Sequence, residues 1–293
     1  MLYRLSILCL LVLISLNLSA QKTLKQEIQS IISDKNAKVG VAVLTGNGEY
    51  IFVNDETEYA MMSTFKFPLA MAVLNQMDKN NIPLDSTLFV SKRDLLPNTY
   101  SPLRDLYPEG NLRISLRNLL KYCVSQSDNN ACDILIRYLG GTQNIQQYLE
   151  KLGIHNMTIA VTEEEMHQKS EKGYWNKTQP SAAVELLERF LKKDLFSSAY
   201  QEFLEQIMIE TSTGPDKLKG QLPASIIVGH KTGSSDRNKK GLKMGDNDMG
   251  FVLLPNGSHY SIAVFVMDSK ETDQTNAAII AQISKAVYEH FQK

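Results

Sequence analysis

The sequence has few of the residues that build metal centres. Five histidines are scattered along 293 residues, three cysteines are present, and neither a His-Glu-x-x-His nor a Cys-x-x-Cys motif occurs. Zinc sites need such ligands at close, regular spacing. We therefore expect no metal and no cofactor.

Disulfide bonding is restricted in the same way. Only Cys123 and Cys132 follow the first twenty residues, nine positions apart in a segment predicted as helix–turn–helix. That spacing does not require the two thiols to approach bonding geometry. We expect buried free thiols, and a disulfide remains the open alternative.

An excess of charge of either sign is also missing. The net charge is −1, and 43% of the residues are hydrophobic against 22% charged. Nucleic-acid or anionic-membrane binding would favour a basic surplus, so neither partner is expected. The composition is that of a globular protein able to form one large domain or two interlocked ones, and we expect a monomer acting on a small molecule.

Long hydrophobic runs are confined to the N-terminus. Arg4 precedes a largely apolar stretch of 14 residues, Leu5 to Leu18, and Leu18-Ser19-Ala20 offers a small-residue cleavage site. The stretch is short for a membrane span and typical of a secretory signal. We predict a signal peptide over residues 1–20, no stable membrane anchor and a periplasmic protein. A retained N-terminal anchor is the alternative.

Strand patterns lie near both ends of the chain, and helical patterns fill the middle. Alternating apolar residues predict strands at 39–43, 49–53, 225–232, 249–254 and 259–267. Helices are predicted at 23–32, from 61 onward, and at 115–124, 127–139, 142–152, 180–191, 197–209 and 273–291. The simplest fold is α+β: a five-stranded antiparallel sheet flanked by terminal helices, with an all-α insertion. The expected subdomains are 21–60 with 209–293 (α/β) and 61–208 (all-α).

Two segments are predicted to be irregular. Residues 80–111 contain four prolines and polar turns, and we expect loops there. Residues 162–179 are polar and lack clean periodicity. A long ordered loop inside a compact domain is usually functional, so we expect this one to carry catalytic residues.

The helix predicted from residue 61 is apolar nearly all round, yet its first turn carries Ser63 and Lys66. Positions i and i+3 share a helix face, so the Lys66 amine can reach the Ser63 hydroxyl. Free N–H groups at the helix start suit a developing oxyanion. Ser63 is therefore a candidate nucleophile. The motif alone is weak, because Ser19–Lys22 repeats it.

Three further stretches follow: Ser127-Asp128-Asn129 at a helix start, Glu163 in the long loop, and Lys231-Thr232-Gly233 at a strand end. Taken singly, they are equally compatible with helix capping, a solvated acidic face and a plain strand end. Ser-x-x-Lys, Ser-Asp-Asn, a loop Glu and Lys-Thr-Gly, in this order, form the motif set of class A β-lactamases and penicillin-binding proteins.

The chain resembles a class A serine β-lactamase over essentially its whole mature length. Glu163 follows Ser127 by 36 residues, as in that family, and the run from Glu163 to His167 is similar to the branch containing the PER and CfxA-type enzymes, many of which hydrolyse extended-spectrum cephalosporins. The resemblance implies a β-lactamase/transpeptidase-like fold and hydrolysis of β-lactam antibiotics.

The resemblance also implies catalytic roles. Ser63 would form an acyl-enzyme and Lys66 would accept or relay its proton. Ser127 would pass a proton to the lactam nitrogen, Lys231 would hold Ser127 and attract the substrate carboxylate, and Glu163 would activate water for deacylation. Either Lys66 or Glu163 can be the acylation base, and the sequence leaves both open.

The substrate-binding residues follow from the same resemblance. The backbone N–H groups of Ser63 and Ser234 would form the oxyanion hole, and His167 replaces an Asn that usually helps to hold the hydrolytic water. Lys217 is the first candidate for the extra cation that binds the substrate carboxylate, with Arg237 second. The charged pair that usually pins the long loop is missing, since Val161 and Asn176 stand near its places. The remaining candidates are Tyr100, Asn129, Thr232 and Gly233.

Two other functions share the Ser63/Lys66/Ser127/Lys231 set: a DD-peptidase and a penicillin-sensing receptor domain. Both deacylate slowly because they lack a carboxylate that activates water. Glu163 therefore favours the hydrolase.

Overall fold

The computed structural model describes residues 24–292. The predicted signal peptide at 1–20 lies outside the described residues. Over the described range, none of the helices combines the length and apolar character that crossing a membrane requires.

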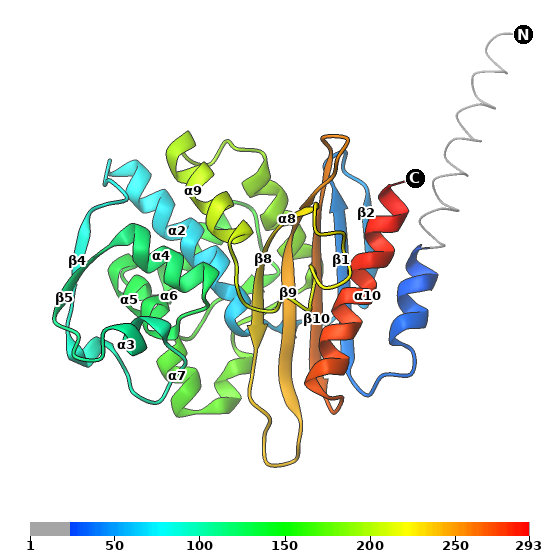
Figure 1. The fold of residues 1–293 in the computed structure, drawn as a ribbon, viewed down its shortest axis with the longest axis horizontal. Coiled ribbons are helices and arrows are strands. Elements are labelled where there is room, and N and C mark those ends of the chain that lie inside the picture. The colour runs from blue at the N-terminus through cyan, green and yellow to red at the C-terminus, as the bar shows by residue number, and fades with distance from the viewer. Residues whose placement is uncertain (1–23, 293) are drawn as a thin grey trace, which may run out of the picture.

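A five-stranded antiparallel sheet forms one half of the molecule (Figure 1). Its strands are β1 (Lys38–Thr45), β2 (Tyr50–Val53), β8 (Ile227–Ser234), β9 (Lys243–Leu253) and β10 (His259–Ser269). They pair in the order β2-β1-β10-β9-β8, so both ends of the chain contribute to one sheet. The predicted fold class is confirmed.

Helices cover both faces of the sheet. Helix α10 (Asp273–Phe291) and the helical residues 24–32 lie on one face, and α8 (Pro180–Leu191) lies against β1 and β10 on the other (Figure 1). Every residue of β1 after Lys38 is buried. Val41 and Val43 belong to the hydrophobic cluster under α10, and Ala42 and Leu44 belong to the cluster on the opposite face of the sheet. Alternate residues of β1 are therefore buried on opposite faces.

The other half of the molecule is mostly helical (Figure 1). The 3₁₀ turn η1 (Met62–Phe65) leads into the central helix α2 (Lys66–Lys79), which is buried along most of its length. Around it lie α3 (Pro102–Leu106), α4 (Leu116–Ser125), α5 (Asn129–Leu139), α6 (Thr142–Lys151), α7 (Glu163–Gln168) and α9 (Ser198–Ile209). Short pieces complete it: η2 (Lys92–Asp94), η3 (Ser170–Tyr174), β3 (Tyr59–Ala60), β4 (Thr87–Val90), β5 (Leu112–Ser115), β6 (Met157–Thr158) and β7 (Lys177–Thr178).

Three sequence predictions need correction. The segment 80–111 is not only loop, because β4 pairs with β5 and α3 begins at Pro102. The segment 162–179 holds α7, η3 and β7; α7 spans six residues, too few to show periodicity, and is defined by a capping box between Thr162 and Glu165. Strand β9 begins at Lys243, six residues before the predicted Met249, because its first half is polar.

One hydrophobic core joins the two halves. It contains Phe67 of α2, Phe190 of α8 and Phe251 of β9, which meet ring to ring. Cys123 and Cys132 are buried in this core as free thiols, as expected. Edge strand β8 packs against η1, so the start of α2 is held at the seam between sheet and helices.

Candidate active site

Ser63 lies in η1, at the seam. The preceding residue, Met62, has a φ of +48°, a left-handed conformation that a branched or bulky side chain adopts only under external constraint. Strand β8 supplies that constraint, because a Cβ on Gly233 would lie 2.6 Å from the Met61 carbonyl oxygen and 3.0 Å from the Ser63 nitrogen. Glycine at 233 thus lets the strand approach the Ser63 backbone.

The Ser63 hydroxyl and the Lys66 ammonium share one carboxylate. Ser63 Oγ donates to Glu163 Oε1 at 3.2 Å, and Lys66 Nζ lies 2.9 Å from the same oxygen. Lys66 is fully buried and also donates to the Ser127 carbonyl oxygen at 2.8 Å and to Asn129 Oδ1 at 2.5 Å. A buried ammonium with three oxygen partners is well satisfied.

The protonation state of Lys66 follows from two opposing effects. Burial disfavours its charge, but the adjacent Glu163 carboxylate favours it, and the result is a raised pKa for Lys66. A lysine must be neutral to accept a proton. In this arrangement Glu163, not Lys66, has the free lone pairs within reach of Ser63 Oγ.

Ser127 and Lys231 form the opposite wall. Ser127 has a φ of +59°, which turns its side chain at the start of α5. Lys231 Nζ donates to Ser127 Oγ at 2.8 Å and to the Thr232 carbonyl oxygen at 2.9 Å. Burial, reinforced by the Lys66 charge, lowers the pKa of Lys231 to about 7. Ser127 is thus a hydroxyl in contact with an ammonium that releases its proton near neutrality.

Two cavities meet at Ser63. The first, about 520 Å³, runs from Ser63 past Thr232 and Ser234 to the start of α10. The second, about 540 Å³, lies between the α7–η3 segment and the turn between β8 and β9. Tyr100, 57% exposed, stands at the rim of the first. The site therefore has space on both sides of Ser63.

The comparisons with known proteins agree with this geometry. The model of the β-lactamase enzyme family matches residues 23–291. The chain belongs to that family. A β-lactamase of Bacteroides uniformis is 49% identical, with 98% of each chain covered, and the extended-spectrum β-lactamase PER-1 of Pseudomonas aeruginosa is 40% identical over 94% of this chain and 90% of its own. The crystal structure of a class A β-lactamase from Bacteroides cellulosilyticus superposes with a TM-score of 0.91 at 52% identity, covering 93% of this chain and 98% of that one.

In this β-lactamase-family chain, the side-chain amide of Asn176 holds the two ends of the segment 162–179 together. Asn176 Oδ1 accepts from the N–H groups of Ala160 and Val161 at 2.8 and 3.0 Å, and its Nδ2 donates to the Val161 carbonyl at 2.9 Å. The Asn176 carbonyl accepts from the Met61 N–H at 2.8 Å. Asn176 therefore closes the loop through its buried side chain and links it to the segment before η1 through its backbone.

Two buried aspartates that the sequence reasoning did not assign hold the catalytic segments. Asp128 accepts from Ser101 Oγ, the Leu103 N–H and the Ala131 N–H, which ties α3 to the start of α5. Asp133 of α5 accepts from the N–H groups of Glu163 and Glu164 at 2.9 and 2.8 Å. Burial, together with the Glu163 charge, raises the pKa of Asp133 to about 7. The Ser-Asp-Asn motif gave a signal for Asp128, but nothing local marks Asp133.

The two cations suggested for carboxylate binding lie in different places. Lys217 lines the first cavity beside Ser63, and its ammonium lies 2.6 Å from Asp246 Oδ1. Arg237 lines the second cavity and donates to the Glu271 carbonyl oxygen and to Asp273. Lys217 therefore has the better position for a ligand that also contacts Thr232.

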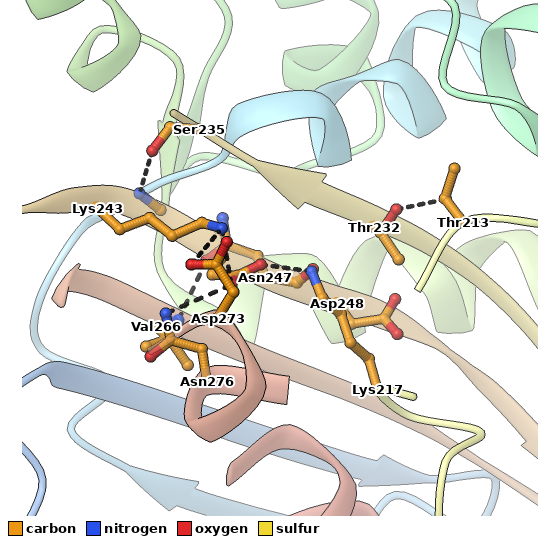
Figure 2. Close-up of polar contacts among 12 residues, drawn as sticks. Thr213, Lys217, Thr232, Ser235, Lys243, Asn247, Asp248, Val266, Asp273 and Asn276 are labelled. Carbon is orange, nitrogen blue, oxygen red and sulfur yellow. Dashed lines mark hydrogen bonds and ion pairs between the residues drawn. The ribbon is translucent and has the colours of Figure 1, made fainter. Parts of the chain in front are cut away.

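The remaining predicted residues divide between the cavities. Thr232 Oγ1 pairs with Thr213 Oγ1 at 2.6 Å in the first cavity (Figure 2). Asn129 lines both cavities, and its Nδ2 donates to Thr99 Oγ1 at 2.7 Å. His167 is exposed and lines the second. Ser234, at the end of β8, lines both.

Proposed function

We propose that this chain hydrolyses the amide bond of β-lactam antibiotics through an acyl-enzyme on Ser63, and so confers resistance to them. The observation that carries the proposal is the hydrogen bond from Ser63 Oγ to Glu163 Oε1 at 3.2 Å, on a carboxylate that also holds Lys66. It joins a nucleophile to a base, which is the requirement for covalent acyl transfer.

In the acylation step, Ser63 Oγ attacks the lactam carbonyl carbon and its proton passes to Glu163. The oxyanion lies against the backbone N–H groups of Ser63 and Ser234; one such donor is worth about 3–4 kcal/mol in the transition state. The ring C–N bond then breaks, and the nitrogen takes the proton of Ser127 Oγ, which Lys231 replenishes across 2.8 Å.

Deacylation reverses the roles around the same carboxylate. The proton that Glu163 took from Ser63 first returns through solvent to the neutral Lys231 amine, which restores the Glu163 carboxylate and the Lys231 ammonium. Glu163 then takes a proton from a water molecule, the hydroxide attacks the ester carbonyl, and Glu163 returns that proton to Ser63 Oγ as the C–O bond breaks. Lys66 stays charged and stabilises the Glu163 carboxylate between the two steps, in keeping with its raised pKa.

The substrates that we propose are small-molecule penicillins and cephalosporins, including extended-spectrum cephalosporins. The first cavity, with Thr232 and Lys217, takes the ring carboxylate, and the second takes the acyl side chain beside Asn129 and His167. A cavity of about 540 Å³ accommodates bulky oxyimino groups. All the catalytic groups come from one chain, which favours a monomer. We propose export to the periplasm from the N-terminal signal pattern.

Two variants of the mature protein test the mechanism. Ser63→Ala is expected to abolish turnover of a chromogenic cephalosporin. Glu163→Ala removes the charge that raises the pKa of Lys66, so the buried Lys66 amine can accept the Ser63 proton in its place. This variant is expected to acylate and then accumulate the covalent adduct, visible by intact-protein mass spectrometry. Turnover of the Glu163→Ala variant at the parent's rate would refute the deacylation role. A parent protein that itself stays acylated and cleaves D-Ala-D-Ala peptides would instead be a DD-peptidase.

A further inference from the structure

A buried carboxylate between two lysines lies in the wall of the first cavity. Asp246 of β9 is 2% exposed; its Oδ1 lies 2.6 Å from the Lys217 ammonium and its Oδ2 lies 3.2 Å from the Lys243 ammonium. Lys217 and Lys243 are 7% and 5% exposed. All three residues line the cavity that contains Ser63.

The position of the Asp246 carboxylate is itself fixed. Asn276 of α10 donates its Nδ2 to Asp246 Oδ2 at 3.4 Å, and its Oδ1 accepts from Ser269 Oγ at 2.7 Å. Lys217 makes a second bond to the Asn247 carbonyl oxygen at 3.3 Å. In Figure 2, Lys243, Asp273 and Asn276 gather at the start of α10, with Lys217 on the neighbouring segment.

The charges of this group do not balance. Lys217, Lys243 and Asp246 carry a net charge of +1. Lys243 also contacts Asp273 at 3.1 Å, but that carboxylate is 66% exposed and is shared with Arg237. With Arg237 and Asp273 included, the group contains three cations (Lys217, Lys243 and Arg237) and two carboxylates (Asp246 and Asp273). Asp216, the other acidic residue lining the cavity, is exposed and screened by solvent.

An uncompensated cation in a buried wall is costly, and an anion in the cavity removes that cost. Both proposed substrate classes carry a carboxylate on the ring next to the lactam. We propose that Asp246 is a positioning residue for this carboxylate: it holds Lys217 and Lys243 together at the cavity wall, so that their surplus positive charge recognises the substrate anion. The inference rests on the proposed function and adds Asp246 and Lys243 to it.

The alternative is that Asp246 only stabilises the fold. The two cases differ when Lys217 is removed. Lys217→Met leaves a buried carboxylate facing the substrate carboxylate, which repels it. If Asp246 holds the lysines for the substrate, Asp246→Asn alone weakens binding, because the two ammonium groups lose the carboxylate that holds them. In the Lys217→Met background the same change instead removes the repulsion and improves binding. If Asp246 is only structural, the second change makes the protein no better or worse.

The experiment measures kcat and KM for parent, Lys217→Met, Asp246→Asn and Lys217→Met/Asp246→Asn. The substrates are a chromogenic cephalosporin and its methyl ester, which lacks the charge. We expect Lys217→Met to raise KM for the carboxylate substrate at least tenfold with kcat changed less than threefold, and the double variant to recover KM at least threefold. The ester KM should vary less than threefold throughout.

Lys240→Met is the matched control, since Lys240 is exposed in the turn between β8 and β9 and its loss removes the same charge. It should leave every value within twofold. Circular dichroism checks that the variants are folded. If Lys217→Met or its double variant is not, Lys243→Met and Lys243→Met/Asp246→Asn provide the same comparison at the second lysine. A double variant no better than its single one, or equal effects on the ester, overturns the inference. A parent that hydrolyses neither substrate refutes the proposed function instead.

Discussion

The carboxylate of Asp133 holds the backbone of Glu163, because Asp133 Oδ1 accepts the Glu163 N–H at 2.9 Å. Its second oxygen holds the next N–H of α7 at 2.8 Å. The position of the proposed water-activating residue thus depends on a buried acid of a different helix. The Glu163 charge, after burial, contributes to the raised pKa of that acid.

The stability of the protein should therefore depend on pH through Asp133. Its pKa in the fold is about 7, against an ordinary value of 3.8, so between those values the folded state binds more protons than the unfolded one. Raising the pH from 4 to 7 then removes stability, roughly 1–4 kcal/mol at about 1.4 kcal/mol per pKa unit. Urea unfolding at several pH values measures this.

Asp133→Asn provides the comparison, since the amide does not titrate. We expect the stability of Asp133→Asn, relative to the parent, to increase as the pH rises from 4 to 7, because only the parent loses the contribution of Asp133. A difference that is flat across this range would show that Asp133 is ionised throughout.

Substitution of Gly233 should disable the site. An added Cβ would lie 2.6 Å from the Met61 carbonyl oxygen, so either β8 or η1 must move. A displacement of about 1 Å at a nucleophile can cost about 100-fold in rate. We expect Gly233→Ala to lower kcat about 100-fold and the free energy of unfolding by about 1–3 kcal/mol, measured by steady-state kinetics and urea unfolding.

Gly153→Ala is a suitable control for that variant. Gly153 has a φ of +80° with no neighbouring atom within 4 Å of the added Cβ, and it lies after α6, away from the site. It should lose about 1 kcal/mol of stability and keep the parent's kcat. Equal loss of activity in both variants would show that stability, not geometry, explains the effect at Gly233.

The pH dependence of catalysis should report Lys231. Its pKa is lowered to about 7 by burial and by Lys66, so above this pH its ammonium becomes neutral and attracts the substrate carboxylate less. We predict a fall in kcat/KM for the free enzyme as pH rises through about 7. Arginine keeps its charge over this range, so the residual activity of Lys231→Arg should lack this fall. An unchanged high-pH limb in that variant would assign it to another group.

Much of the fold could be predicted from the sequence, because long elements bury regular faces. Helix α8 begins at Pro180 and α10 at Asp273, as their patterns predict. Polar segments were harder to predict. Strand β9 begins with Lys243 and contains Asp246, Asn247 and Asp248, which are buried against partners far away in the chain, so no local pattern marks them as a strand.

The site shows the same division. The motif residues Ser63, Lys66, Ser127, Glu163 and Lys231 could be found from their order, and the structure brings them within hydrogen-bonding distance of one another. The residues that hold them could not be found in this way. Asp133 and Asn176 act through backbone groups of other segments, and every residue type except proline offers a backbone N–H.

The amide of Asn176 closes the segment 162–179 with hydrogen bonds between neutral groups. Salt weakens ion pairs between exposed charges, and acid removes them by protonating the carboxylate. A neutral amide is not screened by salt and is not protonated in mild acid. High salt or low pH should therefore leave the hydrogen bonds of Asn176 intact. Any loss of activity under such conditions should come from the charged groups of the enzyme.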